Sequence, residues 1–136
     1  MSIDDKMLGS WAEIQQALRR YPTRSESGDV TTFDWLEAGE VSAIFQVKFA
    51  ELQGRPRIFI GVNVAKDGPT RAHEALVINS ELAVGALVAF KGNIVLRQVM
   101  TVGRFDAAEL FEVIASMAQQ VDVTHGRLMA QVAAPK

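Results

Sequence analysis

Hydrophobic residues near the start of the chain recur at the spacing of an α-helix. Four of them lie on one stripe: Met7, Trp11, Ile14 and Leu18. A repeat of this kind is typical of an amphipathic helix, and we predict one over residues 3–20. Ser2 is a candidate cap, and Gly9 weakens the prediction only slightly. Segment 21–29 is rich in turn-forming residues and has no such repeat, so we expect an exposed connection there.

Alternation with a period of two then predicts three strands, over residues 30–36, 41–52 and 57–65. The short loops Glu37-Ala-Gly-Glu40 and Gln53-Gly-Arg-Pro56 contain the residues that hairpin turns prefer. We therefore expect the three strands to form an antiparallel meander.

The middle strand has the clearest two-sided pattern. Its odd-numbered positions place apolar side chains on one face: Val41, Ala43, Phe45, Val47 and Phe49. Ser42, Gln46 and Lys48 point to the other face, as expected for a half-buried antiparallel strand. Ile44 is the apolar exception on this polar face.

A second helix and a second hairpin are predicted next. Pro69 suits the first turn of a helix because the missing N–H is no loss there. One face of this helix carries Ala72, Ala75, Leu76 and Asn79. We expect the helix to end between Asn79 and Leu82. The apolar runs 85–90 and 94–101 then flank Lys91-Gly-Asn93, which is typical of a tight hairpin turn.

The last predicted helix has the strongest local signal. Asp106 and Glu109 have the spacing of a capping box, and Phe105 and Leu110 that of a hydrophobic staple. The expected buried stripe is Leu110, Ile114, Met117 and Val121. After His125-Gly126 the stripe resumes at Leu128 and Val132. Two alternatives stay open: the helix continues past Gly126, or it restarts as a short terminal turn.

Together these elements predict a single α+β domain over residues 1–136, in the order αβββαββα, with an antiparallel sheet packed by helices. The chain has 136 residues, of which 49% are hydrophobic and 22% are charged. That length and composition are typical of one globular domain with its own core. We see no internal repeat and no low-complexity segment.

Charge and cysteine content narrow the expected partners and location. A formal net charge of -2 gives no basic excess, so we expect neither a nucleic-acid nor a membrane partner. The longest apolar stretch, residues 82–90, is far shorter than the about 20 residues that span a bilayer. The acidic start does not resemble a secretory signal, and the chain has no cysteine. We therefore expect a cytoplasmic protein.

Motifs for catalysis or cofactor binding are missing from the sequence. It contains no glycine-rich phosphate loop, nucleophile elbow, metalloprotease helix motif or Cys-x-x-Cys pair. His73 has no metal-ligand partner at a suitable spacing, and we expect His125 to be a partly buried packing residue. The interpretation is a protein that is not an enzyme, with no cofactor, no metal and no catalytic residue.

One part of the chain resembles a known family. The segments that carry the resemblance are Ala75-Leu-Val-Ile-Asn79, Leu82-Ala-Val-Gly-Ala-Leu-Val-Ala-Phe90, Asn93-Ile-Val-Leu-Arg97 and Phe105-Asp-Ala-Ala-Glu-Leu110. With the element order, they resemble the type III secretion chaperone fold and the related YbjN-like sensory-regulator family. The likeness covers roughly residues 72–122, and the first half matches in element order only.

The resemblance to the chaperones implies a homodimer that offers strand and helix surfaces to an extended, unfolded segment of a client protein. The partner-binding candidates are Ile44, Phe59, Trp35 and Trp11. The dimer-interface candidates are Leu82, Val84 and Val88. For Ile44 and Phe59 an alternative stays open, since the strand pattern also allows helices to cover both side chains.

Three classes of function follow from the sequence. The first is a dimeric, chaperone-like protein that binds a partner polypeptide. The second is a YbjN-like regulatory or scaffolding protein that binds a folded partner. The third is a small enzyme or ligand-binding protein without standard motifs, using carboxylates or His73. The third class would need a concave polar pocket with several convergent titratable groups.

Overall fold

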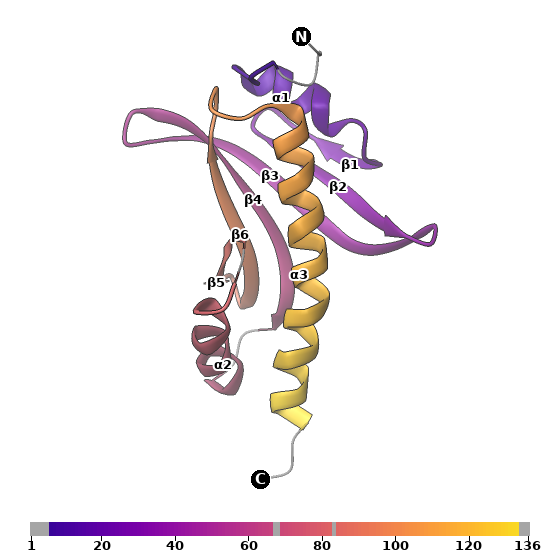
Figure 1. The fold of residues 1–136 in the computed structure, drawn as a ribbon, viewed down its shortest axis with the longest axis vertical. Coiled ribbons are helices and arrows are strands. Elements are labelled where there is room, and N and C mark those ends of the chain that lie inside the picture. Colours follow the sequence, from indigo (N-terminus) through magenta and orange to yellow (C-terminus); the bar gives the residue numbers. More distant parts are fainter. Residues whose placement is uncertain (1–5, 67–68, 83, 134–136) are drawn as a thin grey trace.

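Three helices and six strands make up the described part of the chain, which is residues 6–66, 69–82 and 84–133 of the computed structural model (Figure 1). They are, in chain order, α1 (Trp11–Leu18), β1 (Thr23–Glu26), β2 (Val30–Glu37), β3 (Glu40–Leu52), β4 (Arg55–Lys66), α2 (Pro69–Asn79), β5 (Ala86–Phe90), β6 (Asn93–Thr101) and α3 (Ala107–Ala133).

The six strands form one antiparallel sheet in the order β1-β2-β3-β4-β6-β5. The chain leaves the sheet after β4, forms α2, and returns to the sheet edge as β5, so that β6 pairs with β4. The predicted fold class, an α+β domain whose antiparallel sheet is packed by helices, is confirmed. The observed sheet has one strand more than the predicted order contains.

The additional strand is β1, which lies in the segment predicted as an exposed connection. It pairs with β2 at the edge of the sheet, and its four residues are all exposed. A strand that buries neither face has no reason to alternate apolar with polar residues. The four residues of β1 are exposed as predicted, but they form a strand and not a simple connection, and Tyr21 at the start of the predicted connection is half-buried against the core.

Three tight hairpins set the register of the sheet. The two central residues of each turn have positive φ angles: Ala38 and Gly39, Gln53 and Gly54, Lys91 and Gly92. This combination is the type I′ turn, which matches the twist of the two strands that it joins. The predicted hairpins are confirmed, and because each turn contains only two residues the strands extend up to it on both sides.

One face of the sheet forms the core together with the helices. Aromatic rings stack across it, with Phe33 and Phe45 centroids 5.3 Å apart and Tyr21 and Phe33 centroids 4.6 Å apart. α3 runs along this face over much of the length of the sheet (Figure 1). The buried stripe of α3 is as predicted: Leu110, Ile114, Met117 and Val121. Burial of these apolar side chains is the main favourable contribution to folding.

The first helix is shorter than predicted. α1 begins at Trp11, and Ser10 is its N-cap, with the Ser10 hydroxyl accepting a hydrogen bond from Glu13 N at 3.2 Å. Ser10 and Glu13 therefore form the start signal, with the spacing of a capping box. Met7 is exposed and forms a β-bridge with Asp106, so it does not belong to the buried stripe. The predicted cap Ser2 lies outside the described residues.

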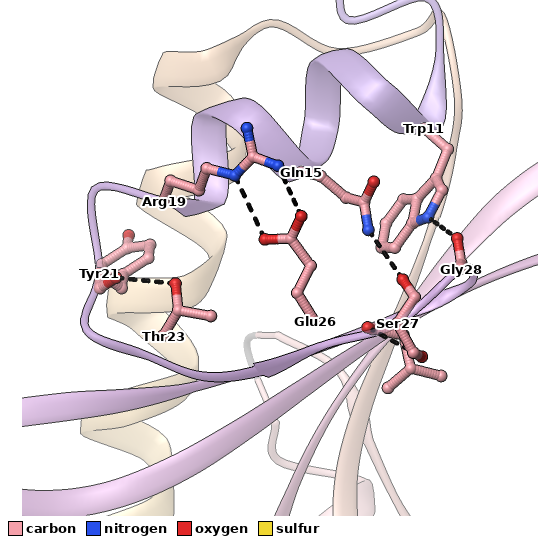
Figure 2. Close-up of polar contacts among 9 residues, drawn as sticks. Trp11, Gln15, Arg19, Tyr21, Thr23, Glu26, Ser27 and Gly28 are labelled. Carbon is pink, nitrogen blue, oxygen red and sulfur yellow. Dashed lines mark hydrogen bonds and ion pairs between the residues drawn. The ribbon is translucent and has the colours of Figure 1, made fainter.

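One side of α1 is attached to the turn between β1 and β2 (Figure 2). The indole nitrogen of Trp11 donates to the Gly28 carbonyl at 2.6 Å, and the Gln15 amide donates to the Ser27 carbonyl at 3.1 Å. Arg19 forms an ion pair with Glu26 at 2.6 Å. The three donors are four residues apart on the helix and reach three consecutive residues, because positions i and i+4 share one helix face.

The last helix begins as predicted, and it continues without interruption through Gly126 to Ala133. The Asp106 carboxylate accepts a hydrogen bond from Glu109 N at 2.8 Å, and Leu128 extends the buried stripe. His125 is exposed, so the prediction of a partly buried packing residue was wrong, because Thr124 occupies the buried position. The Val132 side chain lies outside the described ones.

The bounds of α2 confirm the prediction, but its buried face differs from the predicted one. Ala75 and Ile78 are buried, whereas Leu76 is 71% exposed. The predicted face included the adjacent residues Ala75 and Leu76, and only Ala75 points to the core. The side chain of Ala72 lies outside the described ones. Asn79, at the end of the helix, contacts the sheet edge through its side chain.

Candidate functional site

The second face of the sheet lies opposite the helices. Strand alternation places on it side chains from β3, β4, β6 and β5. We call this surface the open face and define it by Ile44, Gln46, Lys48, Arg57, Phe59, Gly61, Val95, Arg97, Val88 and Phe90. Several of its members are direct partners across strands, so the surface is continuous.

Gly61 lies at the centre of the open face. Its cross-strand partners are Gln46 on β3 and Arg97 on β6. Because glycine has no side chain, the surface is hollowed on both sides of this position. Two adjoining hollows, of about 720 and 550 Å³, share Gly61, Gln46, Val95 and Phe90 in their walls. These volumes lie within the range of about 300–1,000 Å³ that is typical of ligand pockets.

Apolar side chains on this surface are partly accessible to solvent. Ile44 is 45% exposed and Phe90 is 57% exposed. Phe59 and Val88 are half-buried. In the described part of the chain the helices pack against the other face of the sheet, so the alternative that they cover Ile44 and Phe59 is wrong. An uncovered apolar patch next to a hollow is the kind of surface to which a partner binds.

The charged residues among those that define the open face are all cationic, and the acidic residue beside them on β2, Asp34, is the cross-strand partner of Ile44 and pairs with Arg24. Lys48, Arg57 and Arg97 belong to the open face, and Lys91 adjoins it in the turn between β5 and β6. None of these four residues forms an ion pair within the described part of the chain. Two of the four cations lie over aromatic rings, with Arg97 Cζ 5.7 Å from the Phe59 centroid and Lys91 Nζ 5.2 Å from the Phe90 centroid.

The structure divides the predicted partner-binding candidates into two groups. Ile44 and Phe59 share the open face. Trp11 and Trp35 do not, because both pack against the core on the opposite face of the sheet. The ring of Trp11 stacks on Phe49 at 5.7 Å, and that of Trp35 lies 6.3 Å from Phe45.

The predicted dimer-interface candidates are also divided. Val88 lies on the open face, directly opposite Val95. Leu82 and Val84 lie in the connection between α2 and β5, where both are half-buried and pack against the core.

Sequence reasoning missed two central members of the open face. Phe90 has the same strand parity as Val88 and precedes the Lys91-Gly92 turn, so the alternation of Ala86, Val88 and Phe90 is the signal that could have identified it. Gly61 has no such signal, because a glycine within a strand pattern indicates a bulge as readily as a hollow.

Charged groups with shifted pKa values lie away from the open face. Hydrogen bonding and charge interaction with Arg19 lower the pKa of Glu26, and hydrogen bonds to Glu81 and Glu74 help to raise the pKa of Arg127. Burial raises the pKa of Tyr21. These groups attach helices to their neighbours, and no carboxylate or imidazole lines either of the two hollows.

No group of three or more His, Cys, Asp or Glu side chains in the described ranges could hold a metal ion. None of the helices there combines the length and hydrophobicity needed to cross a membrane. The chain matches no model of a known protein family and no curated protein sequence.

Proposed function

We propose that the protein is a non-enzymatic, chaperone-like protein that holds an extended segment of a partner polypeptide on the open face. The observation that supports this proposal is the partly exposed apolar surface around Ile44 and Phe90, which borders a hollow and has no helix over it. Contiguous apolar surface of this kind is usually covered by a partner. An extended segment fits a sheet surface because every second side chain of the segment points toward that surface.

Addition of the partner as a further strand is less well supported, because both sheet edges are restricted. At the β5 edge, the side chain of Asn79 occupies the N–H and the carbonyl of Leu87. At the other edge, β1 has four residues and an irregular register between Thr23 and Ser25. Short and irregular edges discourage strand addition. The proposed segment therefore lies over the open face.

The proposal includes a homodimer whose contact lies at α2 and the connection to β5. Leu76 and Val77 on α2 are exposed, and the candidates Leu82 and Val84 follow in the chain. A symmetric dimer requires one self-complementary patch. Replacing Leu76 by Lys should reduce the mass measured by light scattering from that of a dimer to that of a monomer, whereas Ile44→Ser should leave the mass unchanged.

The volume of the larger hollow is the observation that bears on a second candidate function, the binding of a small ligand, although the hollow is open on one side and no carboxylate or imidazole lines it. At about 720 Å³ it is large enough for a drug-sized molecule. A YbjN-like regulator that binds a folded partner would use the same surface. Two experiments separate these functions. A small ligand should stabilise the protein in a thermal-shift screen. A folded partner should not be displaced by unfolded polypeptide in a competition experiment.

The first test measures binding of a fluorescent, reduced and alkylated test protein by anisotropy. Ile44→Ser should weaken binding at least fivefold, the effect of losing about 1 kcal/mol of contact energy. The matched control is Val123→Ser, because Val123 is 60% exposed on α3, away from the open face. The proposal is wrong if neither variant changes binding, or if both change it equally while remaining folded.

A further inference from the structure

Positive charge is concentrated on one half of the sheet. The strands β4, β6 and β5 are neighbours, and none of them contains an aspartate or a glutamate. Their charged residues are Arg55, Arg57, Lys66 and Arg97. The chain as a whole has 16 acidic and 14 basic residues, so its net negative charge comes from elsewhere in the sequence.

Acidic residues accompany the cations in other parts of the molecule. Arg19 pairs with Glu26, and Arg127 with both Glu74 and Glu81. Arg24 pairs with Asp34, which lies on β2 at the border of the open face, opposite Ile44. These pairs contrast with Lys48, Arg57, Lys91 and Arg97, which have no acidic partner in the described residues. The Nε atom of Arg57 is also buried without a hydrogen-bond partner.

The unpaired cations surround the central hollow. Arg97 is the cross-strand partner of Gly61 on one side. Lys48 belongs to the wall of the second hollow and lies opposite Phe59, the next open-face residue of β4. Lys91 belongs to the wall of the first hollow. A segment whose apolar side chains entered the hollows would therefore have cations within reach on several sides.

We propose that the open face binds an acidic polypeptide segment in which the side chains that point toward the face, every second residue of the extended segment, include both apolar groups and carboxylates. This inference rests on the proposed function and specifies the partner's chemistry. Apolar side chains of the segment fill the hollows beside Gly61, and its carboxylates pair with Lys48, Lys91 and Arg97. Complementary charge of this kind gives an interface its specificity and speeds association more than it adds affinity.

Two other occupants fit this face less well. A second copy of the chain, bound through the same face, would place these cations opposite one another, which is unfavourable. A nucleic acid would contact the cations and the two rings through its phosphates and bases, and would leave the aliphatic members of the face uncovered. The apolar members of the face include Ile44, Val88 and Val95, which suit the side chains of a polypeptide.

Three labelled peptides test the inference. In each peptide one side of the extended chain carries leucine at some positions and Glu, Gln or Lys at the others, and the opposite side carries serine; the three peptides differ only in the choice of Glu, Gln or Lys. Measured by anisotropy at low salt, the Glu peptide should bind at least threefold more tightly than the Gln peptide, and the Lys peptide most weakly. The preference for Glu should shrink as salt is added, because salt screens exposed charges.

Variants locate the preference on the open face. Arg97→Gln should reduce the Glu-over-Gln preference about 1.5- to 5-fold, the range for one exposed ion pair, and Arg97→Lys should retain most of it. The charge-matched control is Arg20→Gln, because the Arg20 guanidinium lies 4.2 Å from the Phe111 centroid, beside α3. Lys48→Gln provides an independent variant if Arg97→Gln does not fold.

The outcomes separate this inference from the proposed function. Equal binding of the Glu and Gln peptides, with Ile44-dependent binding of the unfolded test protein, would overturn the inference alone. No Ile44-dependent binding of any polypeptide would overturn both. Tighter binding of a single-stranded oligonucleotide than of the Glu peptide at the same salt would assign the face to nucleic acid. Conversion of a dimer to a monomer by Ile44→Ser would assign it to a second copy.

Discussion

The side-chain amide of Asn79 hydrogen-bonds both backbone polar groups of Leu87. Its Nδ2 donates to the Leu87 carbonyl at 3.0 Å, and its Oδ1 accepts from the Leu87 N–H at 2.6 Å. These two groups point outward from β5, the edge strand, where no further strand pairs with them. The last residue of α2 thus acts as a substitute for a neighbouring strand and protects the edge.

Asn79→Ala should lower the free energy of unfolding by about 1–3 kcal/mol, because it leaves the partly buried backbone groups of Leu87 without partners. Urea denaturation measures the change. The control is Ser80→Ala, whose hydroxyl donates to the Val77 carbonyl at an exposed site and whose loss should cost no more than about 0.5 kcal/mol. Equal effects of the two variants would show that Asn79 does not protect the edge.

Gly126→Ala should raise the free energy of unfolding by about 0.5–1 kcal/mol, because alanine is the better helix former. An added Cβ at Gly126 would have no heavy atom within 4 Å. Gly85→Ala should have the opposite effect, since Gly85 has φ +72° and its Cβ would lie 2.9 Å from the Arg97 carbonyl oxygen. Destabilisation by Gly126→Ala would contradict a continuous α3.

Ile114→Ala should lower the free energy of unfolding by about 2–5 kcal/mol, the usual cost of truncating a fully buried side chain. The matched control is Val123→Ala on the same helix, where the side chain is mostly exposed and the expected change stays within about 0.5 kcal/mol. Thermal unfolding followed by circular dichroism measures both. An unchanged melting temperature for Ile114→Ala would mean that this stripe of α3 is not in the core.

The Arg19–Glu26 pair should contribute to stability at neutral pH and not in acid. Arg19 lowers the pKa of Glu26 in the folded protein. A carboxyl whose folded pKa is lowered stabilises the fold above its ordinary pKa, about 4.3, and the stabilisation is lost as pH falls through the folded value. Glu26→Gln should therefore melt at a slightly lower temperature than the wild type at pH 7, with the two curves converging in acid.

The control for this pH dependence is Glu112→Gln. Glu112 is exposed on α3 and forms no ion pair with any residue that the structure describes. Its substitution should leave the difference from wild type the same at both pH values. A Glu26→Gln difference that persists undiminished in acid would show that the ionised pair is not its source.

The parts of the fold that the sequence predicts well are those whose signals are local. The hairpin turns were identifiable because a glycine follows a residue that must also adopt positive φ, as at Gln53 and Lys91. The start of α3 was identifiable because Asp106 and Phe105 are both adjacent to the helix that they cap. Local signals do not depend on which elements pack together.

The parts that were missed depend on tertiary partners. Met7 matches the helical repeat, yet residues 7–8 run beside the segment before α3, where Leu8 N donates to the Phe105 carbonyl at 2.9 Å. Strand β1 is stabilised by its pairing with β2 and by α1, not by its own pattern. Ile44 was recognised as an exception on a polar face, but the hollow beside it depends on how Gly61 aligns with its neighbours across the sheet.

The position of Trp11 makes this residue a spectroscopic reporter of one local event. Its indole lies between the Phe49 ring and the Gly28 carbonyl, at the point where α1 meets the β1–β2 turn. The chain has only one other tryptophan, Trp35. In a Trp35→Phe background, the emission wavelength of the remaining indole would follow the docking of α1 during refolding, independently of whatever occupies the opposite side of the sheet.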